Sequence, residues 1–349
     1  MHVKPLLSIC IPTYNRAPLL RQALESILAQ AEASMRDELE IVISDNASTD
    51  DTEAVAAALR AKAPVEIKYF KNTENLGFDG NCLKVVERAI GQYAWLLGSD
   101  DLLSKNALPS LLKELRGKDA IDIYLGEKED FLLEPDCPMY FRKFMSCFTE
   151  KTFDFRKAAT LDGYFKQNKK LIAYLNYIST VVFKRAGWIG VKDKEAYIGS
   201  GYVHLYIFWS MLWGKEPGIM KYLPVPLVNR RWGNDGSVDP EMRLKQDITI
   251  YHRIAKAVFT SRKYIYLIDD MVVRNDGFSW AVRAKLNNPK RFWALILPVM
   301  FRQYWDHVLF WTKIVPLAFI PNIALGLMRW LYRKEVKGEP ISIQEIMAH

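Results

Sequence analysis

The 349-residue chain has only four cysteines, and none lies in a pattern typical of a disulfide scaffold or a zinc site. Cys10, Cys82, Cys137 and Cys147 form no Cys-x-x-Cys pair and have no histidine at zinc-ligand spacing. This excludes the small disulfide-rich domains and the zinc-stabilised folds. Unpaired cysteines favour a reducing compartment, so we expect a cytosolic location.

Two nucleotide-binding motifs are also absent. No Gly-x-Gly-x-x-Gly follows the first apolar run, and no Gly-x-x-x-x-Gly-Lys-Ser/Thr occurs, so neither a nicotinamide site nor a P-loop is supported. Long apolar runs are missing as well. The longest uncharged stretch of the C-terminal part, 314–328, contains two prolines and falls short of the roughly 20 residues that span a bilayer. The N-terminal apolar run is too short for a secretory signal, and we interpret it as a first strand.

Half of the residues are hydrophobic and a quarter are charged, so a packed core is expected. Short apolar runs of strand length alternate with segments of helical periodicity in the first third of the chain. The predicted strands are 6–11, 39–43, 65–70 and 93–97. This alternation predicts an α/β fold in which a mostly parallel sheet is covered by helices on both faces.

A polar cluster follows each of these four predicted strands. The clusters are 13–16 (TYNR), 45–46 (DN), 72–75 (NTEN) and 99–101 (SDD). The carboxyl ends of parallel strands meet at one edge of the sheet, where ligands of such folds bind. We therefore expect a ligand site at this edge.

The run AWLLGSDD at 94–101 ends in two adjacent carboxylates, Asp100 and Asp101. One interpretation is the cap of a following helix, since Ser and Asp accept hydrogen bonds from free N–H groups. The other is a ligand for a divalent metal, and the convergence of four clusters favours it. Carboxylates that hold Mg²⁺ or Mn²⁺ suit a diphosphate, because the metal bridges its oxygens and neutralises the leaving group. Arg16 and Lys71 add positive charge nearby.

Four segments resemble, in order and spacing, the motifs of the inverting family 2 glycosyltransferases with the GT-A nucleotide-sugar fold. They are SICIPTYNR (8–16), IVISDNASTDDT (41–52), NTENLGFDGN (72–81) and GQYAWLLGSDD (91–101). The resemblance implies a Rossmann-like GT-A domain that uses a nucleotide-diphosphate sugar with Mg²⁺ or Mn²⁺ as cofactor. The form WLLGSDD is most similar to transferases of deoxy or dideoxy sugars in O-antigen assembly, such as abequosyltransferases.

The same resemblance implies roles for individual residues. Asp45 contacts the nucleobase, Asp100 contacts the ribose or the sugar, and Asp101 binds the metal at the diphosphate. The other implied nucleotide-sugar contacts are Pro12, Thr13, Tyr14, Asn15, Arg16, Asn46, Asn75, Gly77 and Ser99. The family commonly has Asp-x-Asp-Asp where this chain has Gly98-Ser99-Asp100-Asp101, so the first carboxylate is lost, which bears on sugar or nucleotide preference.

The general base is harder to assign. The family usually has a Glu-Asp pair in its acceptor segment, whereas this chain has no acid between Glu195 and Glu216. Setting GSGYVHLYIF (199–208) beside that segment places His204 at the acidic position, and a neutral histidine can accept a proton at cytosolic pH. Asp193 and Glu195 are alternatives, and His204 as a structural residue in an aromatic face is another interpretation.

Residues 229–237 (NRRWGNDGS) are predicted to form a Gly-rich loop that carries Arg230 and Arg231. Two interpretations remain open. The loop is either a lid that clamps the diphosphate or an ordinary surface turn.

The net charge of +8 is concentrated near the C-terminus, where residues 289–338 hold eight basic and two acidic side chains, a net +6. Aromatic residues alternate with the basic ones there. Such a pattern can stack on single-stranded nucleic acid, but the high aliphatic content favours interfacial helices on an anionic membrane. An ordinary helical subdomain or oligomer contact is the third interpretation. We expect a membrane surface as partner and no nucleic acid.

The sequence thus predicts three regions: a GT-A domain at 1–225, a lid loop and helical extension at 226–288, and an amphipathic membrane-associating tail at 289–349. The predicted protein is a glycosyltransferase, peripheral at the cytoplasmic face of the bacterial inner membrane. It moves a sugar to a hydroxyl of a lipid-linked glycan in surface polysaccharide synthesis.

Two other functions compete with this prediction. A metal-dependent nucleotidyltransferase would also use acidic residues and a parallel sheet, but it usually needs a Gly-rich first loop with Lys or Arg that PTYNRAP lacks. A non-catalytic sugar-binding protein on a transferase fold is supported by the missing Glu-Asp pair and opposed by the retained Asp101.

Overall fold

The computed structural model describes residues 4–117, 120–132, 138–140, 149–168, 170–232 and 240–327. Contacts between residues divide the chain into two compact units, Met1–Asp235 and Gly236–His349. The expected boundary after residue 225 falls inside the strand Ile219–Trp232. The division into three regions stays a prediction.

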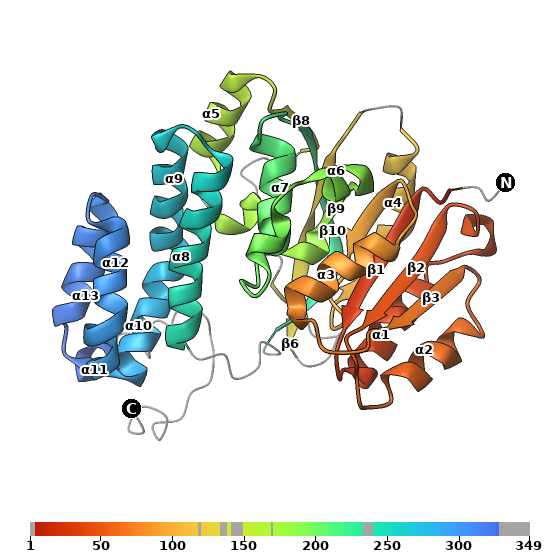
Figure 1. The fold of residues 1–349 in the computed structure, drawn as a ribbon, viewed down its shortest axis with the longest axis horizontal. Helices are drawn as coiled ribbons and strands as arrows, with labels where there is room; N and C mark the ends of the chain where they lie inside the picture. Colours follow the sequence, from red (N-terminus) through yellow and green to blue (C-terminus); the bar gives the residue numbers. More distant parts are fainter. Residues whose placement is uncertain are drawn as a thin grey trace. The chain divides into compact units, whose positions relative to one another are not determined.

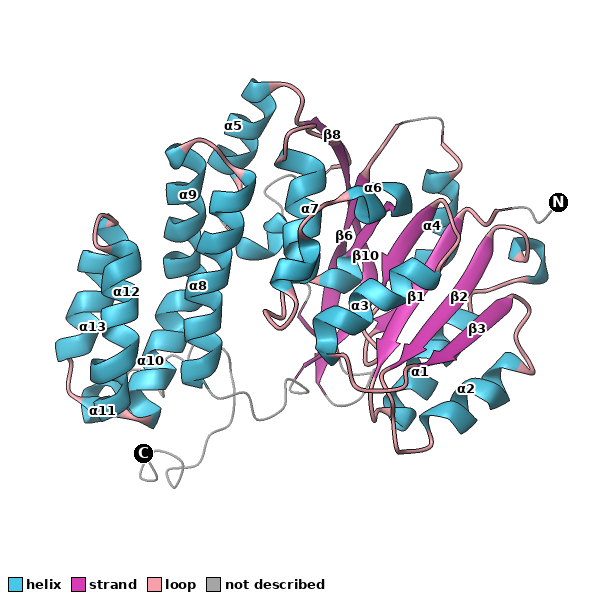
Figure 2. Cartoon of the chain, in the orientation of Figure 1, coloured by secondary structure: helices cyan, strands magenta, loops and turns pink. Residues whose placement is uncertain are grey.

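The first unit is built on a single sheet with the strand order β3-β2-β1-β4-β9-β6-β10-β5, to which β7 and β8 add at β6 and β10 (Figure 2). The strands are β1 (Leu7–Thr13), β2 (Leu39–Asp45), β3 (Glu66–Lys71), β4 (Tyr93–Leu96), β5 (Leu102–Leu103), β6 (Ile123–Leu132), β7 (Pro138–Tyr140), β8 (Lys151–Asp154), β9 (Val181–Lys184) and β10 (Ile219–Trp232).

The predicted α/β half is confirmed. Strands β3, β2, β1 and β4 are parallel neighbours, and each lies within a few residues of its expected range. Every residue of β1 and β2 is buried, as expected of parallel strands that are covered on both faces.

The sheet as a whole is mixed, so the prediction of a mostly parallel sheet was wrong for its second half. Strand β9 lies between β4 and β6 and is antiparallel to both. Strands β5 and β8 are likewise antiparallel to β10, while β10 and β6 are parallel. A short apolar run indicates a buried strand but not its direction, which depends on connections that the run does not encode.

Helices cover both faces of the sheet, as Figure 1 shows. Helices α1, α2 and α4 share one hydrophobic cluster with residues of β1, β2 and β4, whereas α3 packs on the other face of β1 and β2. The α-helices are α1 (Ala17–Leu28), α2 (Thr52–Arg60), α3 (Gly77–Arg88), α4 (Ala107–Leu115), α5 (Ala158–Gln167), α6 (Arg185–Gly190) and α7 (Val203–Trp213). Short 3₁₀ turns are η1 (Ala33–Met35), η2 (Leu171–Tyr174), η3 (Ile178–Thr180) and η4 (Lys194–Tyr197).

The second unit is helical. Its helices are α8 (Pro240–Val258), α9 (Arg262–Val272), α10 (Phe278–Asn287), α11 (Pro289–Arg291), α12 (Leu297–Tyr304) and α13 (Val315–Phe319), with π-helical turns η5 (Val273–Gly277), η6 (Phe292–Ile296) and η7 (Phe310–Ile314).

A hydrophobic core joins α8 and α10 to the later helices of this second unit. Leu244 and Ile248 of α8 lie in the same buried cluster as Phe292, Met300 and Phe310. The described part of the predicted tail therefore contributes core residues as well as surface. Within the described ranges, no helix is both long enough and apolar enough to cross a bilayer.

Candidate active site

The parallel strands bring the predicted polar clusters together at one edge of the sheet. Thr13 at the end of β1 is level with Asp45 at the end of β2, and Asp45 is level with Lys71 at the end of β3. Pro12 is buried one position before this edge. The convergence expected from the sequence is therefore what the structure has, although the role of each residue stays a prediction.

Asn46 connects the end of β2 with the start of α3. Its Nδ2 donates to Asn75 Oδ1 at 2.6 Å and to the Gly77 carbonyl at 3.2 Å. Its Oδ1 accepts from the Leu76 N–H at 2.9 Å and from Asn72 Nδ2 at 3.1 Å. Gly77 has a φ of +71°, a region in which a side chain would be strained. Asn46, Asn75 and Gly77 thus form one hydrogen-bonded polar cluster, which we name the Asn46 wall.

Asn15 connects the loops after β1 and β2. It adopts φ +50°, donates its N–H to Ser48 Oγ at 2.8 Å and accepts the Thr49 N–H at 2.8 Å. Beside it, the ring of Tyr14 is 44% exposed. Thr13 Oγ1 is buried and has no hydrogen-bond partner in the part of the chain that the structure describes. A buried polar atom that lacks a partner is costly, so Thr13 is available to a ligand.

Asp45 is fully buried and both of its carboxylate oxygens are engaged. Oδ1 accepts the Ser48 N–H at 3.0 Å, and Oδ2 accepts the Tyr69 hydroxyl at 2.5 Å. Burial and the Asp45 charge raise the pKa of Tyr69, which keeps its hydroxyl protonated as a donor. A carboxylate has about four acceptor positions, so Asp45 retains the capacity to bind a ligand.

Asp100 and Asp101 do not cap a helix, so the cap interpretation was wrong. They precede the short strand β5, and α4 begins only at Ala107. Ser99 is buried beside them, and Asp100 is partly exposed and forms an ion pair with Arg16 (Nη1 to Oδ2, 3.0 Å).

Gly98, which stands where the family commonly has the first carboxylate, is closely surrounded by these two aspartates. A Cβ at Gly98 would lie 2.9 Å from Asp101 Oδ2 and 3.1 Å from Asp100 Oδ1, closer than ordinary contact.

Asp101 is 3% exposed and is held by two side chains that sequence reasoning missed. The Tyr177 hydroxyl lies 2.7 Å from both carboxylate oxygens, and Ser179 Oγ donates to Oδ2 at 2.5 Å. Burial, followed by the Asp100 charge, raises the pKa of Asp101 to about 7. Tyr177 and Ser179 lie shortly before strand β9, but no periodicity or motif marks them.

Two cations complete this part of the site. Lys128 of β6 and Arg230 of β10 each lie 5.7 Å from the centre of the Tyr177 ring. Arg230 pairs with Asp130 through Nε at 2.8 Å and Nη2 at 3.1 Å, and Lys128 also pairs with Asp130. Burial, and then the nearby Arg230 charge, lower the pKa of Lys128. Positive charge thus gathers beside Asp101.

Arg230 and Arg231 lie in strand β10, so placing them in a loop was wrong. The run 219–232 pairs with β6, and this pairing fixes both backbones. Adjacent strand residues point to opposite faces: Arg231 hydrogen-bonds to Gln22 of α1 and lies over the Phe131 ring, away from Asp130. The remainder of the expected lid, 233–237, lies outside the described residues.

His204 is in the first turn of α7 and is 3% exposed. Its Nε2 lies 3.3 Å from the Asn176 carbonyl, one residue before Tyr177, and its ring meets Phe78 of α3 edge-on at 6.1 Å. The alternatives Asp193 and Glu195 are exposed, and Asp193 precedes η4 with φ +58°. The structure therefore brings His204, and neither acid, into contact with residues around the site.

The fit of a divalent metal can be judged from the donors. No group of three or more His, Cys, Asp or Glu side chains that could hold a metal occurs among the described residues. Mg²⁺, however, is often held by one or two carboxylates together with substrate phosphates. Asp101, with Asp100 beside it, fits an ion that arrives with a diphosphate rather than a preformed metal centre.

Comparison with known proteins decides the family. Residues 8–168 match the model described as Glycosyl transferase family 2. Over 234 residues the chain is 34% identical to the abequosyltransferase RfbV of Salmonella typhimurium, an alignment that covers 66% of this chain and 68% of that protein. The chain belongs to glycosyl transferase family 2. Membership confirms the resemblance found in the sequence and favours sugar transfer over the nucleotidyltransferase alternative.

Other relatives of this family 2 glycosyltransferase agree. It is 39% identical over 111 residues to the GalNAc(5)-diNAcBac-PP-undecaprenol beta-1,3-glucosyltransferase of Campylobacter jejuni, over 32% of this chain and 34% of that protein. Its fold is similar to that of S. aureus TarS 1-349 in complex with UDP-GlcNAc (TM-score 0.61, 15% identity), with 95% of this chain and 87% of TarS covered. At this identity the likeness supports the GT-A-like fold alone.

Proposed function

We propose that the chain transfers a sugar, a deoxy or dideoxy hexose, from a nucleotide-diphosphate donor to a hydroxyl of a lipid-linked glycan in bacterial surface polysaccharide synthesis. The donor assignment rests on one observation: Asp101, which follows Asp100, is held by Tyr177, and the cations Lys128 and Arg230 lie beside the Tyr177 ring. The similarity to RfbV, named an abequosyltransferase, supports the sugar. The Campylobacter relative, whose name contains PP-undecaprenol, supports the lipid-linked acceptor.

In this proposal the nucleoside lies along the ends of β1, β2 and β3. The Asp45 carboxylate accepts hydrogen bonds from the nucleoside, and the buried Thr13 hydroxyl donates to it or accepts from it. Asn75 and Gly77, in the Asn46 wall, lie beside the base and the ribose. Tyr14 offers an exposed ring for stacking on the base. Arg16, which pairs with Asp100, lies at the junction of ribose and diphosphate.

The diphosphate is assigned to Asp101 and its cationic neighbours. Asp101 would hold the Mg²⁺ or Mn²⁺ ion, which would supply positive charge that neutralises the leaving diphosphate. Arg230 and Lys128 stabilise the same developing charge directly, because they are already desolvated and fixed by Asp130. Tyr177 and Ser179 orient the Asp101 carboxylate.

His204 is proposed as the general base that takes the proton of the acceptor hydroxyl. Its contacts with Phe78 of α3 and with the Asn176 carbonyl support this assignment, because both neighbours adjoin the donor site. Its deep burial among aromatic rings supports the competing structural role. Asp193 and Glu195 are the other candidates, and both are exposed.

The second unit is proposed to dock on the anionic cytoplasmic face of the inner membrane as a peripheral region. Large apolar side chains are exposed along its last helices, among them Trp293, Trp305, Trp311 and Phe319. Exposed Lys290, Arg291 and Arg302 lie in the same segment. Aromatic rings favour headgroup depth and basic side chains favour anionic lipid.

A thermal-shift panel of UDP, GDP, CDP, dTDP and their sugars, with and without Mn²⁺, tests the donor assignment, because a ligand of the folded state raises its stability. Metal-dependent stabilisation by one nucleotide, followed by release of that nucleoside diphosphate when acceptor lipid is added, is the expected result. Stabilisation by a free sugar with no turnover would instead favour the non-catalytic sugar-binding alternative.

A further inference from the structure

Asp79 is a buried carboxylate that has no part in the transfer proposed above. It lies in the first turn of α3 and is 2% exposed. Its Oδ2 accepts the N–H of Gly201, 122 residues later in the chain, at 2.7 Å, and its Oδ1 accepts the N–H of Val203 at 3.1 Å. Burial raises the pKa of Asp79, and the nearby backbone N–H groups of 199–203 oppose that rise. Two backbone donors of one short segment therefore converge on this carboxylate, one on each oxygen.

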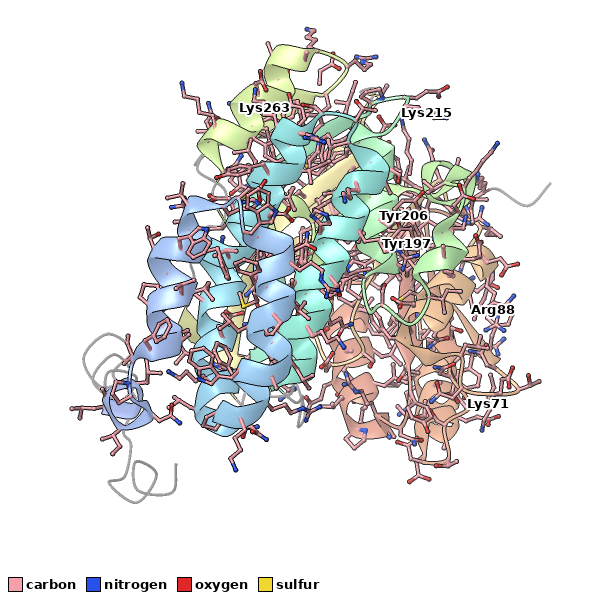
Figure 3. All side chains as sticks on the ribbon, turned by 60° about the vertical axis from the view of Figure 1, so that its left-hand side comes forward. Lys71, Arg88, Tyr197, Tyr206, Lys215 and Lys263 are labelled. Carbon is pink, nitrogen blue, oxygen red and sulfur yellow. The ribbon has the colours of Figure 1, made fainter. Side chains whose placement is uncertain are left out.

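The segment 199–203, which we name the α7 entry loop, directs backbone N–H groups toward this carboxylate. Gly199 and Gly201 adopt φ +84° and +75°, and alternation of such conformations turns successive N–H groups toward one point. Tyr197 before the loop stacks on Tyr206 after it at 4.1 Å, and Figure 3 labels both rings. The stack brings the two ends of the loop together, and Asp79 accepts hydrogen bonds from N–H groups between them.

Asp79 connects the donor side of the site with the acceptor side. On α3, Gly77 belongs to the Asn46 wall, and Phe78 contacts the His204 ring. On the other side, the α7 entry loop leads directly into His204. A displacement of this loop would therefore move the start of α7 relative to a donor held by the Asn46 wall.

We propose that Asp79 is a positioning residue that fastens the α7 entry loop to α3 and so fixes the acceptor-facing start of α7 relative to the bound donor. The inference rests on the proposed function for its kinetic consequence. A neutral amide cannot replace the carboxylate, because an Asn side chain has one acceptor oxygen and would turn an NH₂ group toward backbone donors. Buried N–H groups that lose their acceptor are costly, so the loop would rearrange.

Three variants test the inference. Asp79→Asn removes the charge, and Gly201→Ala strains the loop at φ +75° while leaving the carboxylate in place. Glu40→Gln is the matched control. Glu40 is fully buried and also accepts backbone N–H groups, those of Ile90 at 2.7 Å and Gly91 at 3.2 Å. It lies near the start of β2, away from the site.

Amide hydrogen exchange, calorimetric binding of UDP, GDP and CDP with Mn²⁺, and transfer kinetics are measured on the full chain. For Asp79→Asn we expect exchange in 199–203 to rise at least about tenfold. The nucleotide Kd should stay within about threefold of wild type, while kcat/KM for the acceptor falls about 10²-fold. Gly201→Ala should shift the same quantities in the same direction, which keeps the test valid if Asp79→Asn does not fold.

Unchanged exchange in 199–203 would overturn the inference, and so would normal transfer despite faster exchange. Equal losses of transfer in Asp79→Asn and Glu40→Gln would also overturn it, since they would reveal a general loss of stability. If the wild-type protein transfers no sugar, the proposed function fails. Exchange at 199–203 in Asp79→Asn then decides by itself whether Asp79 fastens the loop.

Discussion

Burial and the neighbouring Asp100 charge raise the pKa of Asp101 to about 7, so the charged form of this carboxylate is costly in the folded protein. Two hydroxyl donors, Tyr177 and Ser179, offset part of that cost. An arrangement that disfavours a charge until a cation arrives is typical of functional sites. Asp101 is thus better explained by a ligand than by the stability of the fold.

Asp101→Asn should lower sugar transfer by at least about 10²-fold, because the amide keeps the shape of the side chain but loses the charge that holds a metal and orders the diphosphate. The Mn²⁺-dependent part of nucleotide binding should disappear with it. Transfer rates and calorimetric titrations with and without EDTA measure both effects. Normal turnover of the variant in EDTA would remove the metal role from Asp101.

The pH dependence of stability tests the raised pKa of Asp101 and shows whether Asp101→Asn is folded. The folded-state pKa of Asp101, about 7, lies above its ordinary value, so the folded state binds a proton more tightly than the unfolded state between about pH 4 and pH 7. In EDTA, this group's contribution to the free energy of unfolding is therefore largest at low pH and is lost as the pH rises toward 7. Urea denaturation at pH 5 and pH 8 should show this loss in the wild type and a smaller one in Asp101→Asn.

His204 can be tested separately. If it is the general base, His204→Asn and His204→Ala should both lose about 10²–10⁴-fold in turnover, the usual contribution of a positioned base, with nucleotide affinity preserved. Steady-state rates and nucleotide Kd values measured together distinguish this outcome from a packing defect, which would lower stability and affect the Ala variant more. Near-normal rates in both variants would pass the role to Asp193 or Glu195.

At the scale of elements, the sequence predicted the part of the site that follows the parallel strands, because a polar cluster comes after each of these strands. The positions of Thr13, Asp45 and Asp101 could therefore be anticipated from spacing. The other part consists of contacts between distant segments. Ser179 reaches Asp101 across 78 residues, and Asp79 reaches Gly201 across 122. No periodicity marks such pairs, because their partners lie far apart in the sequence.

Lys285 shows the same dependence on distant partners in the second unit. It is buried in α10, and its Nζ donates to the carbonyls of Leu317, Ala318 and Ile320 at 2.6–2.8 Å, at the end of α13. Lys285→Met should lower the free energy of unfolding by about 2–3 kcal/mol, because three carbonyls lose a charged donor. Urea denaturation measures the change. Lys290→Met, at an exposed position of α11, is the control and should have little effect.

At the scale of the whole chain, the C-terminal helices contribute to the core of the second unit, so a truncation would not test membrane docking alone. Phe292, Met300 and Phe310 belong to the core that also contains Leu244 and Ile248 of α8. Removal of residues beyond 288 would therefore expose this core and disturb the second unit. Surface substitutions are the better test of membrane docking.

The aromatic surface of the second unit offers suitable positions. Trp305, Trp311 and Phe319 are 61%, 47% and 73% exposed. If this surface docks on a membrane, the triple substitution to Ala should weaken binding to phosphatidylglycerol-containing vesicles at least about tenfold. Each substitution removes an aromatic ring and therefore apolar area that the membrane would bury. Flotation and tryptophan quenching measure the loss. High salt should weaken the wild type as well, because the basic side chains act through screened charge.

The control for this prediction comes from the first unit, where Ile189 and Ile198 are 42% and 47% exposed. Their double substitution to Ala removes exposed apolar surface of a similar kind and should leave flotation unchanged. Unfolding midpoints of both variants should match the wild type, because exposed side chains contribute little to the core. Flotation of the triple variant at the wild-type level would refute membrane docking through these three rings, and the exposed aromatic surface would then be assigned to a protein contact.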